Sequence, residues 1–163
     1  KRKEMEIKNS KILLLGAGGA SRAIIAGFQK ENAKEVTIVN RTKNNGDKLA
    51  EFSKELGLNA SSKTIEGMDS LDSDFDFIVN ASSLGLKNEN NIIPEKLFDE
   101  KTTVYDIVYK PVKTDFINKA KEKNCKIIFG YEMLLGQAIR SFEIWLDRKA
   151  PYDVMKRSIL GGF

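Results

Sequence analysis

Residues 13–23, LLLGAGGASRA, pass from an apolar run through a glycine-rich turn into a segment typical of a helix. A buried strand followed by such a turn and helix is the start of a dinucleotide-binding βαβ unit. Gly16 allows the tight turn, and Gly18 lets a pyrophosphate approach the backbone at the positive end of the helix. The small Ala20 and Ser21 permit close packing of helix on strand. A plain tight strand–helix turn has the same glycines, but the position between a clear strand and a clear helix favours a phosphate-binding site.

Apolar runs and helix-like segments alternate along the rest of the chain. Short strands are expected at 11–16, 35–40, 75–80, 103–108 and 125–130, with a weaker strand at 60–65. Helices are expected at 19–31, 43–57, 113–123 and 131–147, with a short helix near 93–98. The main strand runs are apolar enough to be buried on both faces, which is typical of a parallel sheet. We therefore predict an α/β fold, a Rossmann-type doubly wound parallel sheet of about six strands in strand order 3-2-1-4-5-6.

The sequence indicates a single domain preceded by a short polar segment. The domain is expected to span residues 10–163, and residues 1–9 are interpreted as a linker or the remnant of a preceding segment. The long closing helix carries apolar residues at helical spacing, and we expect nearly all of them in the core. They are Leu134, Leu135, Ala138, Ile139, Phe142, Trp145 and Leu146.

Composition excludes several classes of site and partner. The 163 residues include no histidine, which rules out histidine-ligated metals and Ser-His or Cys-His nucleophiles, and no metal site is expected. The single Cys125 lies in an apolar run and is interpreted as a buried free thiol in a reducing compartment. The net charge is +4 and the lysines are spread along the chain, so we expect no nucleic-acid partner. No apolar stretch approaches about 18 residues, so we expect a cytoplasmic protein with no membrane partner.

The end of the second predicted strand indicates which dinucleotide is bound. Domains that bind NAD usually carry Asp or Glu there, which accepts hydrogen bonds from the ribose 2′-hydroxyl. This chain has Asn40, which does not repel a 2′-phosphate, followed by Arg41, whose planar fork can pair with phosphate and stack on adenine. A solvated basic turn is the alternative interpretation. We predict NADP as the cofactor.

Five motifs occur in an order and spacing that resemble a known family. They are GAGGAS (16–21), NRT (40–42), NASSLG (80–85), YDIVYKPVKT (105–114) and GYEMLLGQA (130–138). Together they resemble the C-terminal half of shikimate dehydrogenases, including the related quinate/shikimate enzymes, over about residues 10–158. The resemblance implies the NADP-binding domain of an enzyme that reversibly reduces 3-dehydroshikimate to shikimate with NADPH in aromatic amino acid biosynthesis.

The resemblance also implies which residues bind the cofactor and the small-molecule substrate. The diphosphate loop would be Gly16, Ala17, Gly18, Gly19 and Ala20, and the 2′-phosphate clamp would be Asn40, Arg41, Thr42, Lys43 and Asn45. The cofactor would also pass along Asn80, Ala81, Ser82 and Ser83, for which a simple loop start is the alternative. The nicotinamide would lie beside Ile107, Met133 and Gly130, where a missing side chain leaves room.

Two polar residues would contact the substrate. Tyr109 and Gln137 match the family's substrate contacts from this domain, and a hydroxyl and an amide can both donate to and accept from ring hydroxyls. An exposed helix glutamine is the alternative for Gln137. We expect the wall around Ile107 and Met133 to be apolar, which would favour self-association as a homodimer.

The chain departs from the family pattern in two respects. Asn45 stands where the family often has a second arginine, which weakens the phosphate clamp, although Lys43 would partly compensate. The substrate-binding serines and the lysine–aspartate pair of the family's N-terminal half have no counterpart here, so no catalytic residue is assigned. We therefore expect the isolated chain to be inactive.

Two other functions are compatible with the sequence. Another NADP-linked reductase, such as a glutamyl-tRNA reductase, shares the glycine turn and NRT, but would not be expected to share YDIVYKP followed by GYEMLLGQA. An NADP-sensing regulatory module would also lack the catalytic pair, and the motifs do not distinguish it from an enzyme domain.

Overall fold

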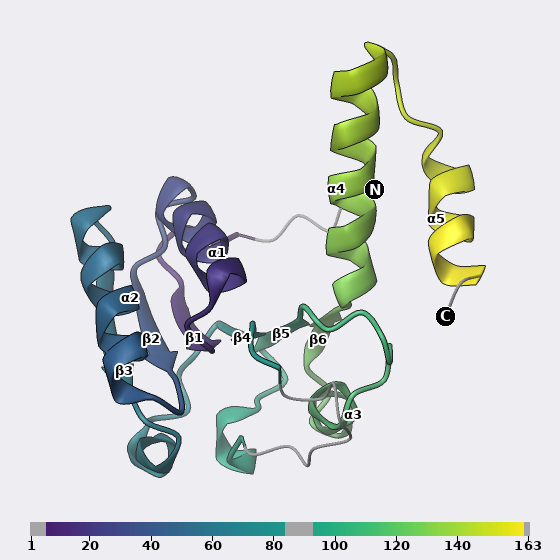
Figure 1. The fold of residues 1–163 in the computed structure, drawn as a ribbon. Helices are drawn as coiled ribbons and strands as arrows, with labels where there is room; N and C mark the ends of the chain where they lie inside the picture. The colour runs from purple at the N-terminus through teal and green to yellow at the C-terminus, as the bar shows by residue number, and fades with distance from the viewer. Residues whose placement is uncertain (1–5, 84–92, 162–163) are drawn as a thin grey trace.

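Six strands form one parallel sheet in the order β3-β2-β1-β4-β5-β6, which confirms the predicted fold class and strand order (Figure 1). The computed structural model describes residues 6–83 and 93–161. Residues 1–5 of the predicted linker, Leu84 and Gly85 of the NASSLG motif, and residues 162–163 lie outside the described residues.

The elements lie close to their predicted positions. The strands are β1 (Lys11–Leu15), β2 (Glu35–Val39), β3 (Asn59–Lys63), β4 (Phe77–Asn80), β5 (Thr103–Asp106) and β6 (Lys126–Ile128). The α-helices are α1 (Gly19–Lys30), α2 (Lys43–Glu55), α3 (Asp115–Glu122), α4 (Gly130–Leu146) and α5 (Tyr152–Gly161). Two 3-10 helices are η1 (Glu66–Ser70) and η2 (Glu95–Leu97). The segment near 93–98 is therefore a 3-10 turn, and the sequence patterns did not predict η1 or α5.

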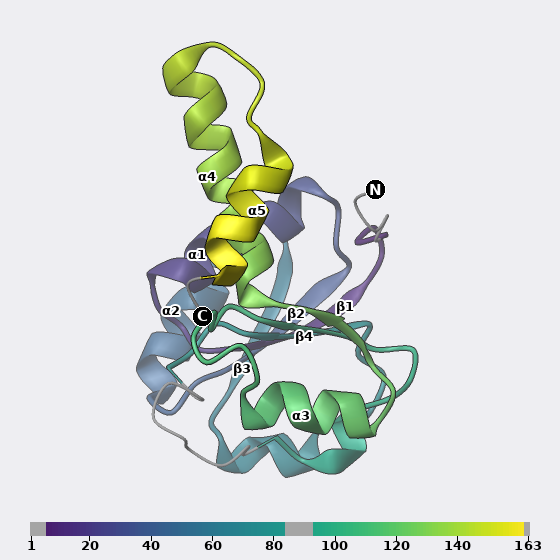
Figure 2. The same cartoon turned by 90° about the vertical axis from the view of Figure 1, so that its right-hand side faces the viewer.

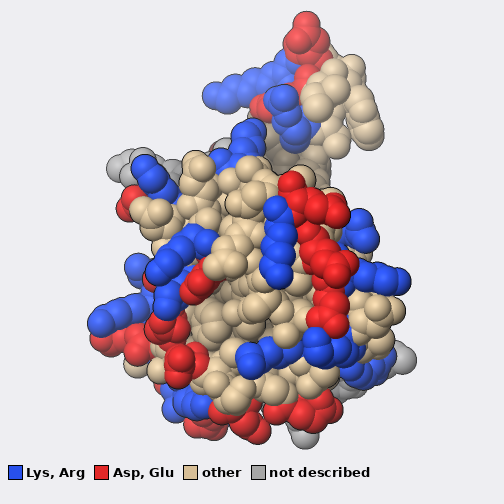
Figure 3. Space-filling model, turned by 90° about the vertical axis from the view of Figure 1, so that its left-hand side faces the viewer, with Lys and Arg blue, Asp and Glu red and all other residues tan. Residues whose placement is uncertain are grey.

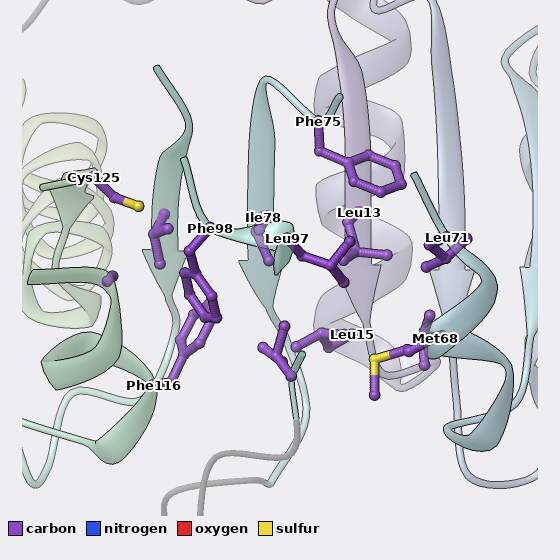
Figure 4. Close-up of a cluster of buried hydrophobic side chains, with 14 residues drawn as sticks. Leu13, Leu15, Met68, Leu71, Phe75, Ile78, Leu97, Phe98, Phe116 and Cys125 are labelled. Atoms are coloured by element: carbon purple, nitrogen blue, oxygen red, sulfur yellow. The ribbon is translucent and has the colours of Figure 1, made fainter. Parts of the chain in front are cut away.

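Strand β1 is buried on both faces, and its side chains alternate between two hydrophobic clusters. Leu13 and Leu15 belong to the first cluster, to which η1, η2 and α3 contribute (Figure 4). Ile12 and Leu14 belong to the second cluster, to which α1 and α2 contribute. Figure 2 shows α3 on the opposite side of the sheet from α1. Because both faces are covered, every one of these four positions is apolar rather than every second one.

Helix α4 projects away from the sheet instead of covering it (Figures 1 and 2). It begins just after the edge strand β6, and α5 packs along it. Only Gly130 and Leu135 of this helix are buried, whereas the exposed fraction is 79% for Trp145 and 48% for Leu146. The prediction that its apolar stripe is core is therefore wrong for every residue except Leu135. Helical periodicity identifies an apolar face, but it does not say whether another element covers that face.

The structure also bears on the predicted thiol and on membrane-spanning helices. Cys125 is a buried free thiol, as predicted, and burial raises the pKa of this group. Within residues 6–83 and 93–161, no helix combines the length and apolarity needed to cross a bilayer.

The buried first cluster and the exposed end of α4 should respond differently when an aliphatic side chain is removed. Leu13→Ala empties part of the first cluster, where Leu13 is 0% exposed, and should lower the free energy of unfolding by about 2–5 kcal/mol. Ile144→Ala on α4, where Ile144 is 63% exposed, should change it by less than about 0.5 kcal/mol. Chemical denaturation followed by circular dichroism measures both. Similar losses from the two variants would contradict this description of α4.

Candidate binding site at the carboxyl ends of the strands

Backbone hydrogen bonds continue the ladder one residue beyond four of the strands. Gly16 N donates to Val39 O (2.8 Å), Asn40 N to Lys63 O (3.1 Å), Ala81 N to Leu15 O (2.8 Å) and Ile107 N to Asn80 O (3.0 Å). These bonds place Gly16, Asn40, Ala81 and Ile107 next to one another at a single edge of the sheet. Four segments that the sequence assigned to one site are thus brought together.

Gly16 is required by the close approach of two turns. Its φ is +97°, and a Cβ here would lie 2.8 Å from the carbonyl oxygen of Ala81 and 3.0 Å from the Ala81 carbonyl carbon. The buried Ser21 hydroxyl donates to the Gly16 carbonyl at 2.9 Å, which holds the start of α1 against the turn. Ala20 is exposed, so the close packing predicted for it is wrong, because at this point of α1 the buried position is that of Ser21.

The rest of the glycine turn faces open space. A Cβ at Gly18 or Gly19 would meet nothing within 4 Å, and both residues are exposed. Gly18 is the N-cap of α1, the first turn of α1 carries no acidic side chain, and the half-buried Ala17 lies between Gly16 and this cap. An uncovered helix N-terminus without nearby negative charge suits a diphosphate.

The turn after β2 contains the predicted phosphate clamp. The side-chain amide of Asn40 donates to the Thr42 carbonyl at 2.8 Å, which shapes the turn and leaves Arg41 exposed. Lys43 begins α2, and its ammonium lies 2.6 and 2.9 Å from the two carboxylate oxygens of Asp47. Asn45 is exposed in the first turn of the same helix. On the face of the molecule shown in Figure 3, basic and acidic side chains are intermixed rather than gathered by sign.

A buried carboxylate joins the turns that follow β4 and β5. Asp106 is 0% exposed and accepts hydrogen bonds from the Asn80 side-chain amide (3.0 Å), Val108 N (3.1 Å) and the Thr114 hydroxyl (2.6 Å). Asn80 in turn accepts from the Ser82 backbone amide (3.1 Å) and hydroxyl (2.6 Å). Burial raises the pKa of Asp106, and these hydrogen bonds oppose that shift. The network therefore fixes both turns relative to the start of α3.

This network was not predicted from the sequence, although the sequence contains a signal for it. Asp106 is the acidic residue within the apolar run 103–108, and a carboxylate in a buried strand needs hydrogen-bond donors around it. Its neighbour Tyr105 is held neutral, because burial, with Glu132 and Asp106 nearby, raises its pKa to about 12. The raised pKa keeps the Tyr105 hydroxyl protonated near neutral pH, and the Asp106 carboxylate is occupied by its three hydrogen-bond donors.

Gly130 brings the start of α4 against the turn after β5. A Cβ at Gly130 would lie 2.5 Å from the carbonyl oxygen of Val108 and 2.6 Å from that of Ile107. The need for glycine here thus comes from the neighbouring backbone, whereas the sequence-based interpretation was that a missing side chain leaves room for the nicotinamide. Ile107 is half-buried and lies between the turn after β4 and the start of α4.

The remaining predicted residues lie farther along their segments. Met133 is half-buried in the first turn of α4, and Gln137 is exposed one turn later. Tyr109 is 45% exposed and follows Ile107 by two residues, and Ser83 is exposed beyond β4. The shared role of Tyr109 and Gln137 in substrate binding stays a prediction.

Two parts of this chain match known protein families, and a curated protein is similar to the whole of it. Residues 1–106 match the Shikimate / quinate 5-dehydrogenase family, and residues 130–160 match the Shikimate 5′-dehydrogenase C-terminal domain. The shikimate dehydrogenase (NADP(+)) of Nitrosopumilus maritimus is 56% identical over 163 residues, which are 100% of this chain and 60% of that protein.

Two solved structures share the fold across nearly the whole chain. The shikimate 5-dehydrogenase of Listeria monocytogenes in complex with shikimate and NAD has a TM-score of 0.85 and 29% identity, covering 94% of this chain and 56% of that one. The ligand-free 5-ketofructose reductase of a Gluconobacter strain has a TM-score of 0.88 and 29% identity, covering 98% and 58%. This chain thus spans little more than half the length of the relatives that it matches.

The geometry of the glycine turn can be tested by two alanine substitutions. Gly16→Ala should lower the free energy of unfolding by about 1–3 kcal/mol, because it forces a side chain into a left-handed conformation against the Ala81 backbone. Gly27→Ala, inside α1 where a Cβ meets nothing within 4 Å, should raise it by up to about 1 kcal/mol. Urea denaturation distinguishes the two signs. Equal effects would contradict the assignment of Gly16 to a constrained turn.

Proposed function

This chain belongs to the shikimate/quinate 5-dehydrogenase family, and on that premise we propose that it is the NADP-binding part of a shikimate dehydrogenase. The reaction is the reversible NADPH-dependent reduction of 3-dehydroshikimate to shikimate in aromatic amino acid biosynthesis. The observation that carries the proposal is the row of Gly16, Asn40, Ala81 and Ile107 at one edge of the sheet, with Gly130 against it. In an open α/β sheet this edge is where dinucleotides bind.

The residues at this edge suit the three parts of NADP. The open Gly18 and Gly19 at the N-terminus of α1 would receive the diphosphate. The exposed Arg41 would pair with the 2′-phosphate, and Asn40 places no negative charge there. The half-buried Ile107 would lie beside the nicotinamide and exclude water from it. NADP, when bound, supplies the hydride acceptor or donor.

The substrate would lie beyond the nicotinamide. Tyr109 and Gln137 present a hydroxyl and an amide from the turn after β5 and from α4, and both groups suit a hydroxylated ring acid. The wall that includes Ile107 and Met133 would favour self-association as a homodimer. We assign no group in this chain to transfer of the substrate's hydroxyl proton. Tyr105 is held protonated by its raised pKa, and the Asp106 carboxylate already accepts three hydrogen bonds.

The similarity to 5-ketofructose reductase makes the substrate a point to be tested. Both named activities belong to proteins that share this fold, so fold alone does not choose between their substrates. The identity of 56% to a shikimate dehydrogenase over the whole chain favours shikimate. Assays of a chain that includes the catalytic residues, with shikimate, quinate and 5-ketofructose in parallel, separate these substrates.

The cofactor assignment predicts a preference for NADP over NAD. Isothermal titration calorimetry at fixed low salt should show tighter binding of NADP, and Arg41→Ala should remove most of the difference while leaving the affinity for NAD nearly unchanged. One charge-assisted hydrogen bond contributes about 1.5–3 kcal/mol, so the loss should be about 10- to 150-fold. Asn45→Arg should increase the preference. Arg157→Ala on α5 serves as the control. Equal affinities of the unaltered chain for the two dinucleotides would contradict the assignment.

The proposed function also predicts that this chain will not turn over substrate by itself. The 163-residue chain should bind NADP but form no detectable NADPH with shikimate, because general acid–base help is missing and is worth about 10²- to 10⁴-fold. Absorbance at the NADPH band measures this directly. Addition of a separately produced N-terminal part of a shikimate dehydrogenase, which carries the lysine–aspartate pair, is expected to restore turnover. A robust rate from this chain alone would show that the catalytic residues have been misplaced, and binding without restoration would favour a sensing module.

A further inference from the structure

We propose that Asp47 is a specificity-determining residue of this site, which holds Lys43 and thereby limits the preference for a dinucleotide with a 2′-phosphate over one with a free 2′-hydroxyl. The inference rests on the proposed function, because it concerns the same adenosine end of the cofactor. It goes beyond that function by assigning a role to an acidic residue that the family motifs do not include.

The position of Asp47 is set by the packing of α2 on the strand ends. Its neighbour Gly46 is buried, and a Cβ there would lie 3.4 Å from the Ser62 side chain and 3.6 Å from that of Asn40. The Ser62 hydroxyl donates to the Asp47 carboxylate. These contacts place the carboxylate at the end of β3, beside the turn that carries Asn40 and Arg41.

Asp47 forms an ion pair with Lys43, which would otherwise be available to a phosphate in the clamp. The Lys43 ammonium lies 2.6 and 2.9 Å from the two carboxylate oxygens of Asp47, one helical turn farther along α2. The hydrogen bond from Lys43, with a second from Ser62, lowers the pKa of Asp47, so the carboxylate is charged at every physiological pH. The pair is therefore neutral as a unit, and Arg41 is left as the unmatched cation of this turn among the described residues.

The carboxylate would act differently on the two dinucleotides. A 2′-phosphate must compete with Asp47 for the ammonium of Lys43. A free ribose hydroxyl carries no charge and gains little from Lys43, so the pairing of Lys43 with Asp47 affects its binding far less. Asn45 supplies no second arginine to offset this, so Lys43 is the one further cation in the clamp. The chain therefore carries Arg41, which is available to a 2′-phosphate, together with a carboxylate, Asp47, that holds the second cation, Lys43.

Removal of the charge on Asp47 tests the inference without changing the shape of the side chain. Calorimetry at fixed low salt gives the Kd values of the 163-residue chain for NADP and NAD. In Asp47→Asn the ratio of the Kd for NAD to that for NADP should rise about threefold to tenfold, because Lys43 is released to the phosphate. In a Lys43→Ala background the same substitution should have little effect on the ratio. Asp47→Ala provides a second variant should the amide perturb α2.

The matched control is an equivalent pair at the other edge of the sheet. Asp74 pairs with Lys11, which begins β1, so Asp74→Asn removes one carboxylate–lysine pair far from the clamp and should leave the ratio unchanged. An unchanged ratio in both Asp47 variants, an equal rise in Asp74→Asn, or a full rise in the Lys43→Ala background would overturn the inference. An unaltered chain that binds neither dinucleotide would contradict the proposed function itself, and the inference with it.

Discussion

In a parallel sheet the hydrogen-bond ladder runs in the same sense between all neighbouring strands, so the chain leaves every strand at the same edge. In this protein the ladder continues past the strand ends, and Gly16, Asn40, Ala81 and Ile107 become neighbours although up to 91 residues of sequence separate them. The site depends on this constraint. Turns that leave adjacent strands at one edge must also share space, and the left-handed Gly16 against the Ala81 carbonyl is the consequence.

The buried network around Asp106 supplies hydrogen-bond partners to the turns at the carboxyl ends of the strands. Turns contain backbone amides that no strand satisfies, and a buried amide without a partner costs stability. The Asp106 carboxylate accepts from Val108 N, from Asn80 and from Thr114, which itself caps α3 by accepting from Ile117 N at 3.2 Å. One side chain thus orders the end of β4, the turn after β5 and the start of the next helix. The cost of burying its charge is offset by three donors.

The sheet and the two C-terminal helices, α4 and α5, differ in how deeply their apolar side chains are buried. Strands β1, β2 and β4 contribute side chains to both hydrophobic clusters, whereas α4 leaves the sheet after its edge strand β6, with α5 beside it. Large apolar side chains at the end of α4 and on α5, among them Ile144, Trp145 and Tyr152, are exposed in the described structure. At one end of the row of strand-end residues, Ile107 lies against Gly130 of α4, so the proposed cofactor site would have its adenosine end on the sheet and its other end at the first turn of α4.

The sequence by itself determined the sheet and assigned Gly16, Asn40, Ala81 and Ile107 to one proposed site, and the structure brings these residues together. The run at 12–15 is apolar at every position because β1 is buried on both faces, and the turn residues that follow it mark where the strand ends. Asn40 and Arg41 could likewise be predicted as part of the 2′-phosphate clamp from their spacing after Gly16 along the sequence. The tertiary structure alone decided that Asp106 is the centre of a network, that the Asp47 carboxylate also meets Ser62 of β3, and that most of the apolar stripe on α4 lies outside the core. Each of these depends on which groups from distant segments meet, and periodicity along one segment carries no information about what lies against it.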